Sequence, residues 1–99
     1  MIDFSQLALA IDAERVGSAV LIRPRIDNPT PLTLDYRLTV TQVSNGNNSR
    51  INQGGEITTG SVPSTVRITL QAGGSCQAHL EVFQAQTLIK SLDRNCDEA

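Results

Sequence analysis

Hydrophobic and polar residues alternate along most of this chain, which is the pattern of strands that bury one face. The clearest stretch is residues 34–41, where polar side chains separate Leu34, Tyr36, Leu38 and Val40. No window of eleven or more residues keeps the i, i+3, i+4, i+7 apolar spacing of an amphipathic helix. The pattern therefore predicts an all-β protein.

Seven stretches carry strand patterns, and turn-forming residues separate them. We expect strands within residues 7–12, 20–23, 34–41, 51–57, 66–71, 76–83 and 87–95. The breaks between them contain Gly, Asn, Ser and Pro, as at 17–18, 27–31, 44–49, 60–64 and 73–74. Seven short strands in a chain of 99 residues predict a single domain over residues 1–99, an immunoglobulin-like, seven-stranded antiparallel β-sandwich.

Composition limits the residue types that can form the core and the classes of partner that the protein can bind. Trp is absent and the aromatic residues are Phe4, Tyr36 and Phe83, so the core must be mainly aliphatic. A net charge of −2 and a pI near 5.1 argue against nucleic acid, because binding phosphates needs an excess of Lys and Arg. The longest apolar run, the five residues 7–11, is far below the roughly 20 residues that span a bilayer. We expect no membrane insertion and no signal peptide within the chain.

The two cysteines are predicted to form a disulfide. If the last two strands form a hairpin closed around Gln86, Phe83 lies opposite Ile89 and Cys76 lies opposite Cys96. A Cys76–Cys96 bond implies an oxidising compartment. The alternative is a pair of buried free thiols in a cytosolic domain. A redox enzyme is not indicated, because the cysteines are not spaced as C-x-x-C.

Catalytic and metal-binding patterns are not found in the sequence. In the expected hairpin the one histidine, His79, lies opposite Asp93 on an outward face, and no G-x-S-x-G elbow accompanies it. The acidic residues Asp93, Asp97 and Glu98 show no known ligand spacing. The doublets at 54–55 and 73–74 lack the strand–helix context of a phosphate loop. We expect no enzyme activity, no metal and no cofactor.

Arginine is the one surface feature that suggests a binding site. Seven of the eight basic residues are Arg. Strand alternation points several of them outward, and an immunoglobulin-type topology would place the first, second, fourth and fifth strands in one sheet. One outer face would then carry Arg23, Arg25, Arg50 and Arg67, with Arg37 on the other sheet. Such a face would attract acidic or amide-rich partners, although arginines on a sheet can also be only solvated or guard against aggregation.

The middle of the chain resembles a known family. Residues 36–40, 44–46 and 49–55, followed by the strand 66–70, are similar to the curli assembly inhibitors of the CsgC/CsgH type, and most similar to the CsgH branch. The resemblance implies a periplasmic, monomeric, immunoglobulin-like chaperone. It would keep the curli major amyloid subunit soluble at substoichiometric ratios through weak, electrostatically guided contact. The Cys-x-Cys motif of the other branch is missing, so a redox role is not transferred.

A second candidate contact is Gln53. Residues 44–55 share the Gln, Asn, Gly and Ser composition of curli subunits, which suggests pairing with a subunit's strand edge; the alternative is an ordinary turn followed by an irregular edge strand. A rival function is an extracytoplasmic fibre subunit or assembly module that acts through edge-strand pairing. The candidate partner-binding residues are Arg23, Arg25, Arg37, Arg50, Gln53 and Arg67.

Overall fold

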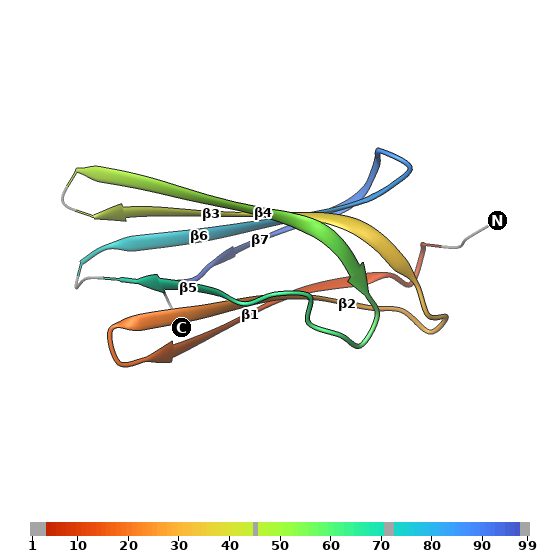
Figure 1. The fold of residues 1–99 in the computed structure, drawn as a ribbon, viewed down its shortest axis with the longest axis horizontal. Coiled ribbons are helices and arrows are strands. Elements are labelled where there is room, and N and C mark those ends of the chain that lie inside the picture. The colour runs from red at the N-terminus through yellow and green to blue at the C-terminus, as the bar shows by residue number, and fades with distance from the viewer. Residues whose placement is uncertain (1–3, 45, 71–72, 98–99) are drawn as a thin grey trace.

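The protein is built entirely of β-strands in the part of the chain that its computed structural model describes, residues 4–44, 46–70 and 73–97 (Figure 1). None of these residues forms a helix that could cross a membrane. The strands are β1 (Ala8–Val16), β2 (Ala19–Asp27), β3 (Thr33–Ser44), β4 (Asn47–Thr58), β5 (Val66–Thr69), β6 (Ser75–Gln84) and β7 (Thr87–Asn95).

Two antiparallel sheets pack face to face and form an elongated molecule of 48 × 23 × 19 Å. The smaller sheet has the order β1-β2-β5, and the larger has the order β4-β3-β6-β7. In Figure 1 the two sheets form an upper and a lower layer, with β4 at one edge of the upper layer. The seven-stranded antiparallel sandwich predicted from the sequence is confirmed.

The expected sheet membership of the fourth strand is wrong. β4 does not join β1, β2 and β5, but pairs with β3 in the other sheet. The physical reason is the length of the β3–β4 hairpin, in which twelve residue pairs keep one register from Thr33 opposite Thr58 to Ser44 opposite Asn47. A continuous antiparallel ladder of this length holds β4 beside β3.

The β3–β4 connection is also shorter than expected. The sequence suggested a turn over residues 44–49, but β3 extends to Ser44 and β4 begins at Asn47; Asn45 lies outside the described residues. Gly46 has a φ of 79°, a conformation that glycine adopts without steric cost. Polar residues on both sides continue the ladder because backbone pairing does not require apolar side chains.

The β6–β7 hairpin closes with a tight two-residue turn at Ala85 and Gln86, both of which have positive φ. Such a turn matches the twist of the two strands and places Gln84 opposite Thr87. A register shift between Val82 and Phe83 absorbs the extra residue on β7, so Phe83 lies opposite Leu88. The predicted pairing of Phe83 with Ile89 is therefore wrong, because the turn is one residue shorter than a loop centred on Gln86.

Farther along the same hairpin the expected register is correct and the disulfide is confirmed. His79 lies opposite Asp93, and Cys76 is bonded to Cys96 with a Cα–Cα distance of 5.0 Å. The Cys96 amide also donates to the Cys76 carbonyl at 2.9 Å. Both cysteines are buried, so the bond fastens the end of β7 to the core.

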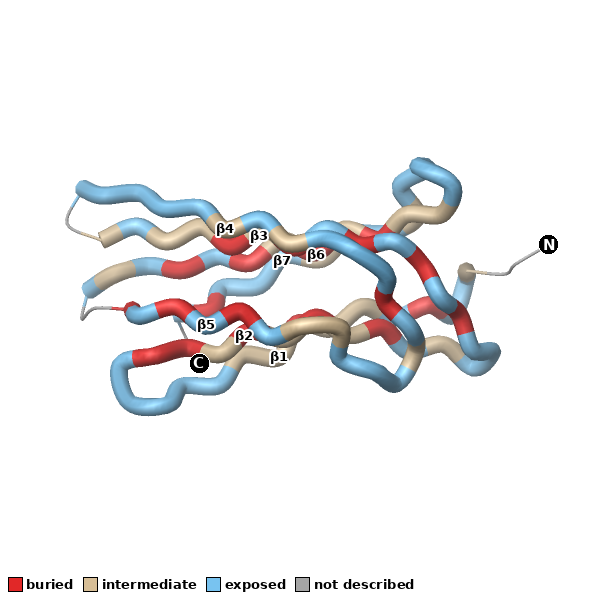
Figure 2. Tube along the Cα trace, viewed as in Figure 1, coloured by how far each residue is buried: buried red, intermediate tan, exposed pale blue. Residues whose placement is uncertain are grey.

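The core between the sheets is aliphatic, as the composition predicted. Its fully buried side chains come from both sheets, and Figure 2 shows the buried positions alternating with exposed ones along the strands. Tyr36 is the one buried aromatic residue among those described, with 6 % of its surface exposed. The largest fully buried side chains include Ile22, Ile26, Leu38, Ile57 and Leu80.

Candidate partner-binding surfaces

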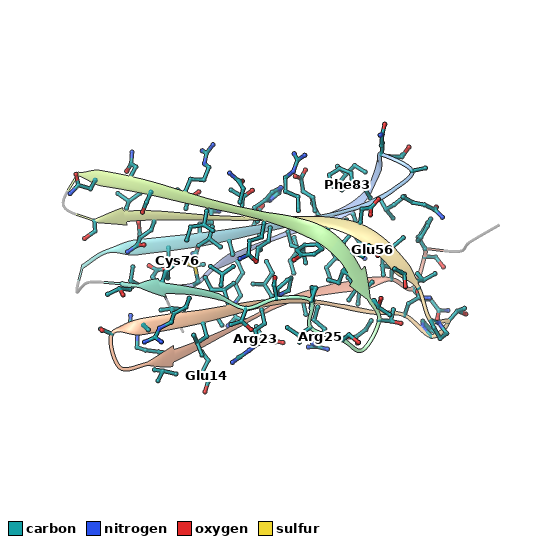
Figure 3. The ribbon with its side chains drawn as sticks, in the orientation of Figure 1. Glu14, Arg23, Arg25, Glu56, Cys76 and Phe83 are labelled. Carbon is teal, nitrogen blue, oxygen red and sulfur yellow. A yellow bond between two sulfur atoms is a disulfide. The ribbon has the colours of Figure 1, made fainter. Side chains whose placement is uncertain are left out.

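The outer face of the three-stranded sheet carries three of the predicted arginines. Arg23 and Arg25 lie on β2 and Arg67 lies on β5, at positions that alternate with buried residues such as Ile22 and Ile26. In Figure 3 the side chains of Arg23 and Arg25 point away from the core, below the lower sheet. Strand alternation therefore placed these three residues correctly.

Acidic residues on the same face compensate two of these arginines. Arg23 Nη1 lies 3.3 Å from Glu14 Oε2, and Arg25 contacts Asp12 at 3.3 Å and Asp27 at 2.6 Å. The hydrogen bond with Asp12, helped by the charges of Asp12 and Asp27, raises the pKa of Arg25. Arg23 and Arg25 thus contact three carboxylates, and because Arg67 adds the third positive charge, the formal charges of this group sum to zero rather than making the face basic.

Arg50 is separated from that group, which corrects the predicted four-arginine face. It lies on β4, in the four-stranded sheet, and makes no ion pair with any described residue. The first four residues of β4 are all exposed, on both faces of the strand. Beside them is a hollow of about 380 Å³, lined by Thr41, Val43, Asn48, Ser49 and Arg50.

Arg37 lies on the four-stranded sheet, as expected. Its guanidinium carbon is 5.8 Å from the centre of the Phe83 ring, the distance of a cation–π contact. Phe83 is labelled in Figure 3, close to the β6–β7 turn. These two residues help to line a hollow of about 270 Å³ together with Asp35, Tyr36 and Gln86.

Gln53 is half-buried and lies on the inner side of β4, with Ile51 and Ile57, rather than on the outer face of the sheet. Ser64 Oγ donates a hydrogen bond to Gln53 Oε1 at 2.8 Å, and the Tyr36 hydroxyl lies 2.9 Å from Ser64 Oγ. Because the single hydroxyl proton of Ser64 goes to Gln53, Tyr36 is the donor in the second bond. This chain of three residues ties β3 and β4 to the segment that precedes β5.

Across the middle of the four-stranded sheet runs a row of polar side chains. Asn52, Thr39, His79 and Asp93 are successive partners on β4, β3, β6 and β7. Thr39 Oγ1 donates to Asn52 Oδ1 at 2.9 Å. His79 Nδ1 lies 2.5 Å from Asp93 Oδ1, while its Nε2 lies 3.7 Å from Glu81.

The histidine is engaged at both ring nitrogens. Its hydrogen bond with Asp93 raises the pKa of His79, with smaller contributions from the charges of Asp93 and Glu81, and partial burial opposes the shift. A protonated imidazole between two carboxylates is a satisfied ion pair rather than a free general base. Among the described residues no group of three His, Cys, Asp or Glu side chains could hold a metal; Glu98 lies outside them.

Sequence reasoning missed two cationic side chains that cross between the sheets at the β1/β7 side. Lys90 Nζ donates to the Leu7 carbonyl at 2.6 Å, and Arg94 Nη1 donates to the Ile11 carbonyl at 2.5 Å. On β7 these two residues share the inward side with Leu92, which packs against the core. Inward-pointing charges on an edge strand are a known device for blocking strand addition, and this pattern was visible in the sequence.

These features define a small, disulfide-bonded, immunoglobulin-like sandwich. In a comparison with solved structures the chain is similar to the solution structure of CsgH from R. palustris, with a TM-score of 0.75, 19 % identity, and coverage of 93 % of this chain and 94 % of that one. It is also similar to the E. coli curli protein CsgC, with a TM-score of 0.70, 10 % identity, and coverage of 88 % and 96 %. No protein-family model and no curated protein sequence matches it. The chain therefore has the CsgC/CsgH-type fold, and neither structure bears the name of an enzyme.

Proposed function

We propose that the protein is a periplasmic chaperone, without enzyme activity, that delays amyloid aggregation of the curli major subunit through transient contact at substoichiometric ratios. The observation that carries this proposal is the match of nearly the whole chain to CsgH and to CsgC, the latter named as a curli protein. The Tyr36–Gly55 region that resembles this family in sequence forms the β3–β4 hairpin of the matched fold.

The distribution of charge supports weak, electrostatically guided binding. Arg50 and Arg67 are exposed and have no carboxylate partner among the described residues, whereas Arg23 and Arg25 are already paired. Unpaired arginines can meet acidic or amide groups of another chain without first breaking an internal contact. We assign the first encounter to Arg50 and Arg67, together with Arg37 on the four-stranded sheet.

The disulfide supports a location outside the cytosol, because such bonds persist in oxidising compartments. The engagement of His79 by Asp93 and Glu81 supports a function without catalysis. A monomer suffices for this role, since the partner is an unfolded or early aggregated chain.

The test is the lag time of curli major-subunit aggregation, followed by amyloid-dye fluorescence, with the protein at a small fraction of the subunit concentration. We expect the lag to lengthen severalfold, and an unchanged lag would contradict the proposal. Arg50→Glu with Arg67→Glu should shorten the lag again while leaving the fold intact. The matched control, Arg23→Gln with Arg25→Gln, should have the smaller effect because those charges are already balanced.

A second candidate is a fibre subunit or assembly module that acts through edge-strand pairing. The long, exposed edge of β4 favours it. This candidate requires the pure protein to polymerise as its concentration rises. Sedimentation velocity over a hundredfold concentration range decides between the two, because a chaperone of the proposed kind stays monomeric.

A further inference from the structure

The backbone groups at the free edge of β4 can be identified from the hydrogen bonds around it. In an antiparallel pair, alternate residues bond to the neighbouring strand and the residues between them point their N–H and C=O away. The Thr59 amide donates to the Leu32 carbonyl at 3.0 Å, one step beyond the β3–β4 register. That register is unbroken, so the odd-numbered residues of β4 bond to β3. Asn48, Arg50 and Asn52 therefore direct their backbone donors and acceptors outward.

The same alternation shows that two other edges have side-chain partners for some of their outward carbonyls. The outward carbonyls of Leu7, the residue before β1, and of Ile11 on β1 accept hydrogen bonds from Lys90 and Arg94. β5 has only four residues, and the carbonyl of Thr69 accepts a hydrogen bond from the side-chain amide of Gln42. Short length and side chains that cap carbonyls both discourage an added strand.

The β7 edge is guarded by charge. Lys90, Asp93 and Arg94 all lie within its nine residues. An incoming strand would have to displace or desolvate these side chains. Edges of this kind resist pairing.

The β4 edge between Asn47 and Gly55 has none of these devices. It contains no proline, and its one charged residue is Arg50. None of the turn and loop hydrogen bonds formed by described backbone groups involves this stretch. The Ser64 contact closes the edge at Gln53, so the open part runs from Asn47 to Asn52.

We infer that this open edge binds an extended segment of the partner as an added strand, through the backbone groups of Asn48, Arg50 and Asn52. The partner's identity as an amyloid subunit rests on the proposed function, but its chemistry follows from the edge itself. The side chains of Asn48 and Asn52 flank Arg50 on the outer face, so the best-matched segment is rich in Asn and Gln and carries a carboxylate, or no charge, opposite Arg50. A cation at that position is disfavoured by repulsion from Arg50.

A second copy of this chain fits the edge less well. Two β4 strands that pair antiparallel over residues 47–52, with their outer faces on the same side, place the two Arg50 side chains opposite or diagonal to each other. Like charges at these positions destabilise a strand pair. The edge therefore suits a different, amide-rich chain.

The test uses a synthetic peptide, Gln-Ser-Asn-Glu-Asn-Ser-Gln, titrated into the full ¹⁵N-labelled protein. We expect the amide signals of Asn48, Arg50 and Asn52 to shift and their hydrogen exchange to slow. The double variant Asn48→Pro with Asn52→Pro removes two outward N–H groups but no β3–β4 hydrogen bond, and should weaken binding at least tenfold. The matched control is Ser91→Pro, an exposed β7 position whose N–H also points outward, and it should bind as the wild type does.

Lysine variants at the same positions test the inference even if the proline variant does not fold. Asn48→Lys with Asn52→Lys leaves the backbone unchanged and adds the charges that block natural edges; it should also lose peptide binding, while Ser91→Lys should not. The inference would be overturned if the peptide shifted only the signals of the face that carries Arg23, Arg25 and Arg67. It would also be overturned if the β4 signals shifted without peptide because the protein forms a dimer.

The same variants separate this inference from the proposed function. If the wild type and the lysine variant lengthen the aggregation lag equally, the chaperone function stands and the edge is not its binding surface. If the peptide binds at the edge but the lag is unchanged, the edge binds extended strands and the proposed function is wrong.

Discussion

The two lateral sides of the sandwich, where edge strands of the two sheets face each other, are closed in different ways. At the β1/β7 side, Lys90 and Arg94 reach from one sheet to backbone carbonyls of the other, and the disulfide fastens the end of β7. At the β4/β5 side, neutral contacts such as Ser64 with Gln53 close part of the gap and leave β4 open from Asn47 to Asn52. The contrast indicates that the β1/β7 side stabilises the fold. The β4/β5 side leaves backbone groups of β4 free for hydrogen bonds with a partner strand.

The largest expected effect comes from breaking the closed side at its disulfide. Cys76→Ala with Cys96→Ala should lower the free energy of unfolding by about 3 kcal/mol, since the bond closes a loop with a sequence separation of 20. Urea unfolding under non-reducing conditions measures the loss. Hydrogen exchange should rise more in β7 than in β4, and a uniform rise would contradict the role of the bond as a local fastening.

Removing the two cationic contacts should have the next largest effect. Lys90→Met with Arg94→Met deletes two charge-assisted hydrogen bonds to carbonyls, and we expect a loss of about 1.5 kcal/mol after allowing for their partial exposure. Thermal unfolding checks the value. Arg15→Met is the control, because exposed Arg15 makes no contact of this kind and should change stability by less than about 0.5 kcal/mol. Equal losses in both variants would refute the assignment.

A smaller effect is expected at the β4/β5 side from Tyr36→Phe. The change removes the hydrogen bond that Tyr36 donates to Ser64 while leaving the ring in the core, so the loss should be about 1 kcal/mol. A double-mutant cycle with Ser64→Ala isolates the interaction, and purely additive losses would show that the two hydroxyls are not coupled. Peptide binding at the β4 edge should become weaker if this contact holds the strand in place.

The smallest effect should be a dependence of stability on pH at His79. Because contact with Asp93 raises the pKa of His79 above 6.5, the protonated ring stabilises the folded state, fully below pH 6.5 and not at all once the pH exceeds the raised value. His79→Gln should therefore cost less than about 1 kcal/mol near pH 5.5 and nothing at about pH 9. Unfolding curves at the two pH values check this sign. The opposite trend would mean that the neutral ring is the stabilising form.

The reach of sequence reasoning differs between the fold and the candidate site. Alternation predicted all seven strands, and a local hairpin register was enough to pair Cys76 with Cys96. The outward direction of Arg23, Arg25 and Arg67 was also correct. The shared face with Arg50 was not, because alternation tells on which side of its own strand a residue lies but not which sheet the strand joins.

By itself the sequence determined the strands, their buried faces, the aliphatic core and the disulfide, because these depend on side-chain period, composition and neighbouring segments of the chain. Only the tertiary structure decided that acidic residues neutralise Arg23 and Arg25, that Gln53 is turned inward, and which edges are capped. The reason is physical: ion pairs and edge contacts join residues that are distant in the chain, and their energies depend on distances that no local pattern records.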